Sequence, residues 1–479
     1  MKNIKKTSCA LFIAIFVLHV SGISWCTGQE TETEGGPMEK REKEALYSAI
    51  QGFVGKGWNG SDLYPDPCGW TPIQGVACDI YDGYWYVTTL SIGLIHENSL
   101  GCAPNVQFSP QLFQLGRLKS LSFFNCMSHR SHPVTIPAQN WSALSGSLES
   151  LEFRSNPGLI GQIPATFGGL MRLQSLVLLE NGLSGNVPTN VGNLPNLKRL
   201  VLSGNRLTGQ VPVNFGALSE LLILDLSRNS LSGTLPFTLG SLRSLLKLDL
   251  SRNRFVGNIP NQIGNLKNLT LLDLSNNKFS GGLPQSFESL VSLQELVLSG
   301  NLIGGDITRL SWPNLESLII LDLSNIGLTG EVPESISELK NLRFLGLNDN
   351  KLTGELPSKV ATLSNISAIY IHGNNLTGEL KFSETFYGKM GRRFGAWDNP
   401  NLCYRTGVLS NSKVPYGVKA CQQQVNLYGK NIDADSKLGS NQDSQMVASL
   451  GYSRNGMNGF LCVYLAKMVM TVVVFIISM

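Results

Sequence analysis

The chain has 479 residues, and its 38 Lys and Arg residues against 34 Asp and Glu residues leave a formal net charge of +4 at pH 7. So small a charge on a chain of this length argues against a dedicated nucleic-acid-binding protein. The two ends of the chain differ in composition from its middle, and each region predicts a different kind of structure.

Residues 1–28 have the pattern of a secretory signal peptide. Lys2, Lys5 and Lys6 precede an apolar run at 9–20, and small and polar residues follow around 24–28. The apolar run is shorter than the roughly 20 residues that a spanning helix needs, which favours a signal peptide over a first transmembrane helix. We therefore expect the rest of the chain to enter the secretory pathway, where disulfides persist.

The nine cysteines sort by position along the chain. Cys9 and Cys26 lie in the expected signal peptide, and Cys462 lies in the C-terminal tail. The other six form an even set divided between the two ends of the body, which indicates disulfides at the ends and none in the middle. These six are Cys68, Cys78, Cys102, Cys126, Cys403 and Cys421.

The segment 44–53 (EALYSAIQGF) is expected to be a helix that precedes a repeat array. Its apolar residues Ala45, Leu46, Ile50 and Phe53 share one helical face. A repeat stack needs such an end cap, since its terminal core would otherwise face water.

Residues 87–374 repeat the pattern L-x-x-L-x-L-x-x-N, with a spacing of 24 residues in the middle of the chain. Counting degenerate copies, the pattern occurs about twelve times. Its alternating leucines predict short strands, stacked as a parallel sheet over one continuous core. The final Asn is expected to point inward and satisfy backbone groups at the turn. These ladder positions are Asn156, Asn181, Asn205, Asn229, Asn253, Asn277, Asn301, Asn350 and Asn374.

Two copies lack the ladder Asn, and one of them is also irregular. Cys126 takes the place of the Asn in the second copy, and Ile326 takes it in a later one, where Asn325 precedes it. Between Gly304 and Ile326 the usual proline motif is missing and the copy is one residue longer. We expect a local irregularity there, which represents either sequence drift or a contact surface.

The second half of each copy carries Gly-x-[Ile/Val/Leu]-Pro, as in GQIP, GNVP and GTLP. Glycine tolerates the tight turn after the strand, and proline fixes φ where no ladder donor is needed. This form resembles the plant extracellular subclass of leucine-rich repeats. The resemblance implies an α/β repeat solenoid, a plant-type superhelix of about 12 repeats over residues 87–380, closed by disulfide-bonded caps.

The segments 29–86 and 381–421 resemble the caps of plant leucine-rich repeat proteins. The first contains DPCGWTPIQGVACD, in which TPIQ lengthens the usual C-x-W-x-G-V-x-C form, and the second contains WDNPNLC. The resemblance implies the pairs Cys68–Cys78 and Cys403–Cys421, which leaves Cys102 and Cys126 as the third pair. A competing hypothesis is a zinc site of Cys102, Cys126, His129 and His132. The oxidising compartment and the absence of a finger-like helix favour a loop at 129–137 instead.

No catalytic constellation is complete in the sequence. There is no G-x-S-x-G, H-E-x-x-H, phosphate-loop or kinase signature. Asp225, Asp249, Asp273 and Asp322 recur at one repeat position, but this residue comes with the LDLS form of the repeat and is expected on the exposed face of the strand. We therefore expect no enzyme activity, no metal and no cofactor.

The x positions of the strand pattern instead predict a broad concave surface for a partner. Phe344, Tyr370 and His372 are unusual there, and exposed aromatic residues are typical of interfaces. The C-terminal repeats are thus a candidate contact site for a protein or peptide ligand. The alternative is a solvated face with scattered aromatic residues.

Five N-glycosylation sequons are present, each expected at an accessible position in a secreted glycoprotein. They begin at Asn59, Asn140, Asn268, Asn365 and Asn375. Asn375 adjoins the ladder residue Asn374 and is the weakest of these candidates.

Residues 422–459 form a polar linker, and the apolar tail 460–479 carries a single charge at Lys467. As a helix the tail would be about 30 Å long, enough to span a bilayer. No Lys or Arg follows it, and Arg454 precedes it, which is unfavourable for a positive-inside arrangement. Small residues, a polar spacer and an apolar tail over 439–479 favour a glycosylphosphatidylinositol-anchor signal over a membrane helix.

The body, the caps and the missing kinase signature together resemble plant receptor-like proteins. The stretches DPCGWTPIQGV, NCMSHRSHPVTIP and WDNPNLC are most similar to the Piriformospora indica-insensitive group, relatives of the TOO MANY MOUTHS type. The resemblance implies a protein on the extracellular face of the plasma membrane that responds to a root endophyte or other microbe through a partner receptor kinase. The alternatives are a polygalacturonase-inhibitor-like defence protein, which the apolar tail disfavours, and a structural wall protein, for which Pro-rich stretches are missing.

Overall fold

The computed structural model describes residues 36–93, 100–129, 131–406 and 414–421. The chain divides into two units, Met1–Gln422 and Gln423–Met479. The expected signal peptide, polar linker and apolar tail lie outside the described residues, so the account below concerns the first unit.

The N-terminal cap begins with the predicted helix, α2 (Lys40–Val54), followed by the short helix α3 (Gly60–Leu63). The predicted apolar face of α2 is buried, including Leu46, Ile50 and Phe53. Glu42 on the same helix is also buried, and its Oε1 accepts a hydrogen bond from the backbone N–H of Val87 at 3.0 Å. Burial raises the pKa of the Glu42 carboxyl, and the Val87 N–H partly opposes that rise. This contact attaches the cap to the first repeat.

A 14-stranded sheet runs through the whole unit, with one strand contributed by each repeat. β1 is antiparallel to β2, and every later neighbour is parallel, which confirms the predicted parallel stack. Equivalent residues pair in register, as Leu224 does with Leu200 and Leu248. The strands are β1 (Val76–Tyr81), β2 (Tyr84–Gly93), β3 (Ser120–Phe124), β5 (Ser150–Arg154), β7 (Ser175–Leu179), β9 (Arg199–Val201), β11 (Ile223–Asp225), β13 (Lys247–Asp249), β15 (Leu271–Asp273), β17 (Glu295–Val297), β18 (Ile320–Asp322), β19 (Phe344–Gly346), β20 (Ala368–Tyr370) and β22 (Phe394–Gly395).

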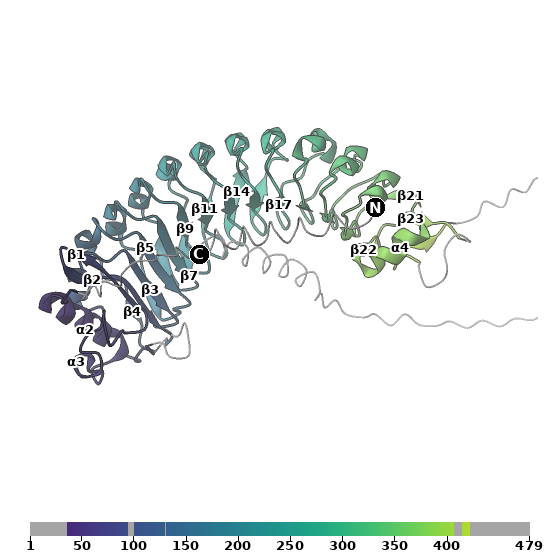
Figure 1. Cartoon of the computed structure of the whole chain (residues 1–479). Helices are drawn as coiled ribbons and strands as arrows, with labels where there is room; N and C mark the ends of the chain where they lie inside the picture. Colours follow the sequence, from purple (N-terminus) through teal and green to yellow (C-terminus); the bar gives the residue numbers. More distant parts are fainter. Residues whose placement is uncertain (1–35, 94–99, 130, 407–413, 422–479) are drawn as a thin grey trace, which may run out of the picture. The chain divides into compact units, whose positions relative to one another are not determined.

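Short 3₁₀ helices occupy the side of the repeats opposite the long sheet (Figure 1). Most begin directly after the recurring proline, whose fixed φ suits the entry into the turn; Pro212, for example, has φ −60° before η5. These helices are η1 (Pro110–Gln114), η2 (Trp141–Leu144), η3 (Ala165–Gly169), η4 (Thr189–Asn193), η5 (Val213–Ala217), η6 (Phe237–Ser241), η7 (Asn261–Asn265), η8 (Gln285–Ser289), η9 (Ile307–Arg309), η10 (Trp312–Leu315), η11 (Glu334–Glu338), η12 (Ser358–Thr362) and η13 (Gly391–Arg393).

Many repeats have a second short strand, which follows the strand of the long sheet and precedes the 3₁₀ helix along the chain. These second strands, with those of the C-terminal cap, form three smaller sheets among the described residues. They are β4 (Val134–Thr135), β6 (Leu159–Gly161), β8 (Gly182–Asn186), β10 (Arg206–Thr208), β12 (Ser232–Gly233), β14 (Arg254–Asn258), β16 (Lys278–Ser280), β21 (Thr377–Leu380), β23 (Asn401–Tyr404) and β24 (Lys419–Ala420). The C-terminal cap adds helix α4 (Glu384–Met390).

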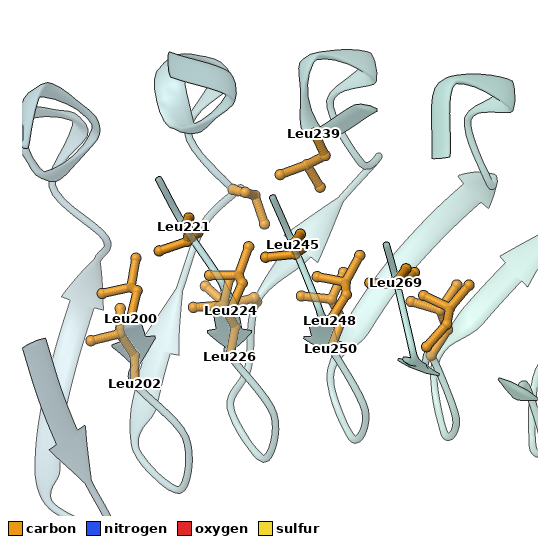
Figure 2. Close-up of a cluster of buried hydrophobic side chains, with 14 of the residues drawn as sticks. Leu200, Leu202, Leu221, Leu224, Leu226, Leu239, Leu245, Leu248, Leu250 and Leu269 are labelled. Atoms are coloured by element: carbon orange, nitrogen blue, oxygen red, sulfur yellow. The ribbon is translucent and has the colours of Figure 1, made fainter. Parts of the chain in front are cut away.

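Leucines from successive repeats fill the space between the strands and the 3₁₀ helices (Figure 2). Leu224 and Leu226 from one repeat, Leu248 from the next and Leu239 from a 3₁₀ helix all have 0% exposure. Burying one leucine side chain stabilises a fold by about 1.5–3 kcal/mol. Because each repeat supplies these leucines at the same positions, the core continues from repeat to repeat.

The predicted Asn ladder forms hydrogen bonds that link neighbouring repeats. Asn301 Nδ2 donates to the carbonyls of Leu274 at 3.0 Å and Leu298 at 2.8 Å. Its Oδ1 accepts from the N–H of Phe279 at 3.0 Å. One buried side chain thus satisfies three backbone groups that the turn leaves without a strand partner.

Where a repeat lacks the ladder Asn, the next Asn accepts the extra N–H. Asn156 Oδ1 accepts from Cys126 N–H at 2.8 Å as well as from Met127 N–H at 2.9 Å. Asn350 Oδ1 likewise accepts from Ile326 N–H at 3.1 Å and Leu328 N–H at 3.0 Å. The ladder therefore tolerates a missing residue because the carbonyl oxygen of an amide has two lone pairs.

The ladder continues one step beyond the expected end of the repeats. Asn399, which the sequence placed in the cap motif, donates from Nδ2 to the carbonyls of Ile371 and Ala396 and accepts from Leu376 N–H. The preceding strand β22 is the last strand of the long sheet. Residues 394–399 thus behave as a further repeat within the segment expected to be cap alone.

The irregularity predicted between Gly304 and Ile326 is present. Two short 3₁₀ helices, η9 and η10, stand where the other repeats have one. Trp312 in η10 is fully buried, and its Nε1 donates to the carbonyl of Ile307 at 3.1 Å. The extra residue is thus accommodated by packing a large side chain into the core.

Three disulfides join the cysteine pairs expected from the resemblance. They are Cys68–Cys78 in the N-terminal cap, Cys102–Cys126 at the start of the repeats, and Cys403–Cys421 in the C-terminal cap. Each disulfide closes a loop and so reduces the conformational entropy of the unfolded chain. A disulfide that closes a loop of this size contributes about 3 kcal/mol of stability.

Candidate functional site

The candidate site lies on the outer side of the long sheet near its C-terminal end, and we call this side of the sheet the strand face. It is built from side chains that alternate with the buried leucines of each strand. Phe344 lies on β19 and Tyr370 on the neighbouring β20, with ring centroids 5.8 Å apart. His372 follows two residues after Tyr370, with ring centroids 6.1 Å apart. All three sequence-predicted contact residues therefore meet in one cluster.

Two further aromatic residues extend this cluster into the C-terminal cap. The Trp397 ring stacks on His372, with centroids 4.0 Å apart and planes at 15°. Tyr416 meets Trp397 edge-on at 6.0 Å and is 75% exposed. We call Phe344, Tyr370, His372, Trp397 and Tyr416 the aromatic row.

Trp397 was not among the contact residues predicted from the sequence, although the sequence contains a signal for it. The segment 394–399 reads FGAWDN, which matches the end of the repeat pattern if Phe and Ala replace the two leucines. In that frame Trp397 occupies the position that His372 has in the preceding repeat. Tyr416 lies outside any repeat, and only the folded cap brings it to the row.

The three aromatic residues expected to be exposed are only partly so. Phe344, Tyr370 and His372 are half-buried, and the His372 side chain is only 18% exposed. The reason is mutual stacking, since each ring covers part of the next. A half-buried row of this kind presents ring edges and faces that are already held in place, so a partner would order few side chains on binding.

Glycine at position 395 makes room for the row. A Cβ there would lie 2.8 Å from both Tyr370 Cδ1 and Trp397 Cζ3, and 3.0 Å from His372 Nδ1. These distances are below normal carbon contacts, so any side chain would displace the rings. The close packing of the row thus depends on a residue that carries no side chain.

His372 lies among carboxylates but is held neutral. Its Nε2 is 3.9 Å from Asp349 Oδ2. Burial lowers the pKa of the imidazole, and the charges of Asp349 and Asp398 oppose the shift without cancelling it. At neutral pH the row therefore contains no positive charge, while two carboxylates lie close to it.

The Asp residues of the LDLS repeats are not where the sequence placed them. Asp249, Asp273 and Asp322 are 3%, 4% and 8% exposed, so the expectation of an exposed position is wrong for these three. In each case Oδ1 accepts hydrogen bonds from the backbone N–H and hydroxyl of the Ser two residues later. These carboxylates fold back on their own repeat and stabilise the turn.

The strand face nearer the N-terminus carries paired charges. Arg154 Nε is 2.7 Å from Glu152 Oε2, and Arg228 Nη1 is 3.1 Å from Glu180 Oε1. Lys247 Nζ lies 3.4 Å from Asp225 Oδ2. Opposite charges thus neutralise one another over these repeats.

All five sequon asparagines are exposed, including Asn375. Asn268 and Asn365 occupy the same repeat position, and their Nδ2 atoms donate to the carbonyls of Arg243 at 3.1 Å and Lys340 at 2.9 Å. Exposure makes each site accessible, and glycosylation at these residues remains a prediction.

The zinc hypothesis loses two of its ligands in this structure, because Cys102 and Cys126 are joined in a disulfide. Within the described ranges, no group of three or more His, Cys, Asp or Glu residues could hold a metal ion. The described residues also contain no helix with the length and apolar character needed to cross a bilayer.

Comparison with known families identifies the repeats. Residues 195–255 and 258–303 match the family model described as Leucine rich repeat, and residues 317–339 and 341–363 match a second model of that description. The chain is 60% identical over 171 residues to Piriformospora indica-insensitive protein 2 of Arabidopsis thaliana, covering 35% of this chain and 40% of that protein. It is 33% identical over 172 residues to Receptor like protein 29 of the same plant, covering 35% of each. The matched region spans less than half the length of either relative.

Solved structures give the same fold. The plant peptide hormone receptor RGFR1 in complex with RGF2 matches with a TM-score of 0.54 and 31% identity, over 62% of this chain and 46% of that one. The PEPR1–AtPEP1 structure matches with a TM-score of 0.58 and 26% identity, over 76% of this chain and 52% of that one. The fold is therefore the plant leucine-rich repeat solenoid that the sequence predicted.

Proposed function

We propose that this chain, a leucine-rich repeat solenoid similar to plant receptor-like proteins, is a cell-surface recognition protein that binds a protein or peptide partner on its strand face. The proposed role is binding, not catalysis. The observation that carries it is the aromatic row, a set of stacked rings at one end of the strand face. Aromatic residues with rigid, half-buried positions are the usual anchors of protein interfaces.

The comparisons support the proposal at the level of the fold. RGFR1, which matches over 62% of this chain, is named as a peptide hormone receptor and is bound to RGF2. Receptor like protein 29 matches over 35% of the chain. Because the repeat geometry is shared, the complex of RGFR1 with RGF2 supports binding of a peptide by this solenoid.

The finer parts of the proposal concern cellular context. The similarity to Piriformospora indica-insensitive protein 2 supports a role in the response to a root endophyte or other microbe. Residues 1–28 would direct the chain to the secretory pathway and residues 460–479 would attach it to the plasma membrane, facing outward. In this proposal a partner receptor kinase carries the signal inward.

Affinity purification tests the proposal. The tagged full chain is expressed in plant roots, and co-purifying membrane proteins are identified by mass spectrometry for the wild type and for Phe344→Ala/Tyr370→Ala. We expect a receptor kinase to co-purify with the wild type. The amount of this kinase recovered should fall roughly tenfold or more with the double variant, because truncating interface anchors has effects of this size.

Phe237→Ala is the matched control, since Phe237 is 65% exposed and lies on η6, on the opposite side of the repeats. It should retain the partner. Recovery of a secreted microbial hydrolase alone would favour an inhibitor, and equal recovery from all three proteins would contradict binding on the strand face.

A further inference from the structure

The charge of the strand face changes along the array. Strands β5, β7, β9, β11 and β13, with the three residues after each, together carry both signs. The cations there are Arg154, Arg199, Arg228, Lys247 and Arg252, and the acids include Glu152, Asp225 and Asp249. This part of the face is close to neutral because its ion pairs join opposite charges.

The C-terminal part of the same face carries more acids than cations. Arg393, directly before β22, occupies the position that Phe344 has in its repeat, and its guanidinium donates to the carbonyls of Met390 and Lys389. The strands β15, β17, β18, β19, β20 and β22, with the three residues that follow each, include no Lys or Arg. The acids in these segments are Asp273, Glu295, Asp322, Asp349 and Asp398. Since Asp273 and Asp322 are buried against Ser hydroxyls, the carboxylates that reach the surface near the aromatic row are Asp349 and Asp398.

These two carboxylates lie beside the aromatic row. Asp349 follows β19, its side chain is 54% exposed, and it lies beside His372. Asp398 adjoins Trp397 in sequence and is exposed, and its charge also acts on His372. Both residues have positive φ, 59° and 52°, at equivalent turn positions of their repeats. Two carboxylates therefore lie along one edge of the row, and its own histidine is neutral at neutral pH.

We propose that the C-terminal end of the strand face binds a cationic peptide segment of its partner, with an arginine over the aromatic row and its guanidinium paired with Asp349 or Asp398. This inference rests on the proposed function and names the chemistry of the partner. Aromatic faces attract cations, and the planar guanidinium stacks on rings while forming bidentate bonds to a carboxylate. Lysine should bind more weakly because its ammonium is more strongly hydrated and cannot form the planar pair.

Charge complementarity also selects against other occupants. An acidic segment would meet two like charges, and an apolar segment would partly desolvate both carboxylates without supplying a new partner. A cationic segment satisfies both requirements of the surface, since it covers the rings and neutralises the carboxylates.

The test uses the full chain, purified in detergent, and a random peptide library displayed on phage. Selections are run in parallel on the wild type, Asp349→Asn/Asp398→Asn, Phe344→Ala/Tyr370→Ala and a matched control. The control, Glu334→Gln/Glu338→Gln, removes the same charge from exposed residues of η11 on the opposite side of the repeats. Selected peptides are synthesised, and their Kd values are measured by fluorescence polarisation at low and high salt.

We expect peptides selected on the wild type to be enriched in arginine over lysine. Their Kd should rise roughly tenfold or more with Asp349→Asn/Asp398→Asn and stay unchanged with the control, because only the first pair of carboxylates faces the row. High salt should weaken binding to the wild type more than to the Asn variant.

Peptides that lose affinity with Phe344→Ala/Tyr370→Ala but not with Asp349→Asn/Asp398→Asn would overturn the cationic partner and leave the proposed function standing. Peptides whose affinity falls equally with the control variant would also overturn the cationic partner, since the overall negative charge of the protein, and not this site, would then attract them. If no selected peptide loses affinity with Phe344→Ala/Tyr370→Ala, the proposed function is contradicted too, because ligands would not bind at this end of the strand face.

Discussion

His372 and Trp397 stack at 4.0 Å with nearly parallel rings, although one lies in a predicted repeat and the other in a segment predicted to be cap. The two residues hold equivalent positions in successive repeats, so the pairing of β20 with β22 places one ring over the other. The stack therefore joins the end of the repeat array to the C-terminal cap, and it lies within the proposed binding surface.

Replacing Trp397 should affect stability at this junction. Trp397→Ala removes the ring that covers His372 and contacts Tyr416, and we expect a loss of about 1–3 kcal/mol in the free energy of unfolding. Trp70→Ala is the control, since Trp70 is 94% exposed and should change stability by less than about 0.5 kcal/mol. Urea unfolding of both variants measures the difference, and equal losses would show that the stack is not stabilising.

Adding one methyl group at Gly395 should disturb the row without removing any of it. The Cβ of Gly395→Ala would lie 2.8 Å from Tyr370 and Trp397, and we expect a cost of about 1–3 kcal/mol together with altered tryptophan fluorescence. Gly169→Ala is the matched control, because a Cβ there has no neighbour within 4 Å. A Gly395→Ala variant as stable as this control, with unchanged fluorescence, would mean that the rings can move at little cost.

A ladder Asn should be far more sensitive than an Asn on the outside of the repeats. Asn301→Ala leaves three backbone groups without their partner, and we expect a loss of at least about 2 kcal/mol, since each unsatisfied buried group costs about 1–3 kcal/mol. Asn196→Ala removes one exposed bond to the carbonyl of Met171 and should cost about 1 kcal/mol or less. Thermal unfolding of the two variants measures both losses of stability. A larger loss for Asn196→Ala than for Asn301→Ala would contradict the structural role of the ladder.

The buried carboxyl of Asp322 should make stability depend on pH. Burial raises the pKa of this group above its ordinary value, against the hydrogen bonds from Ser324. The folded protein therefore holds the proton more tightly than the unfolded chain, so the contribution of Asp322 to stability is fully present below its ordinary pKa and is lost as pH rises through the raised pKa.

Asp322→Asn removes this titration while keeping an acceptor for Ser324. We expect the variant to gain stability relative to the wild type as pH rises from the ordinary carboxyl pKa through the raised one. Urea midpoints measured across that range test the sign. A difference between the two proteins that does not change with pH, or that changes in the opposite direction, would refute a raised pKa in the folded state.

Membrane attachment by residues 460–479 can be tested directly. If these residues form a glycosylphosphatidylinositol-anchor signal, phosphatidylinositol-specific phospholipase C should release the protein from plant membranes. A protein retained after treatment, while a known anchored protein is released from the same membranes, would favour a membrane helix.

The sequence alone determined the repeat fold, because the spacing of leucines and asparagines is a local pattern that recurs along the chain. It also located the predicted helix 44–53, the irregular repeat near Trp312 and the aromatic residues Phe344, Tyr370 and His372. Each of these depends on which residues lie a fixed distance apart along one chain, and such distances can be read before folding.

Only the tertiary structure decided how those residues are used. In the stacked repeats, Asp249, Asp273 and Asp322 are buried against Ser residues, and the aromatic residues are half-buried. Asn399 is also part of the Asn ladder. The tertiary structure also brought Trp397 and Tyr416 to the row and left Asp349 and Asp398 as the surface carboxylates beside it. These outcomes depend on contacts between different repeats and between the last repeat and its cap, and such contacts form only when the chain has folded.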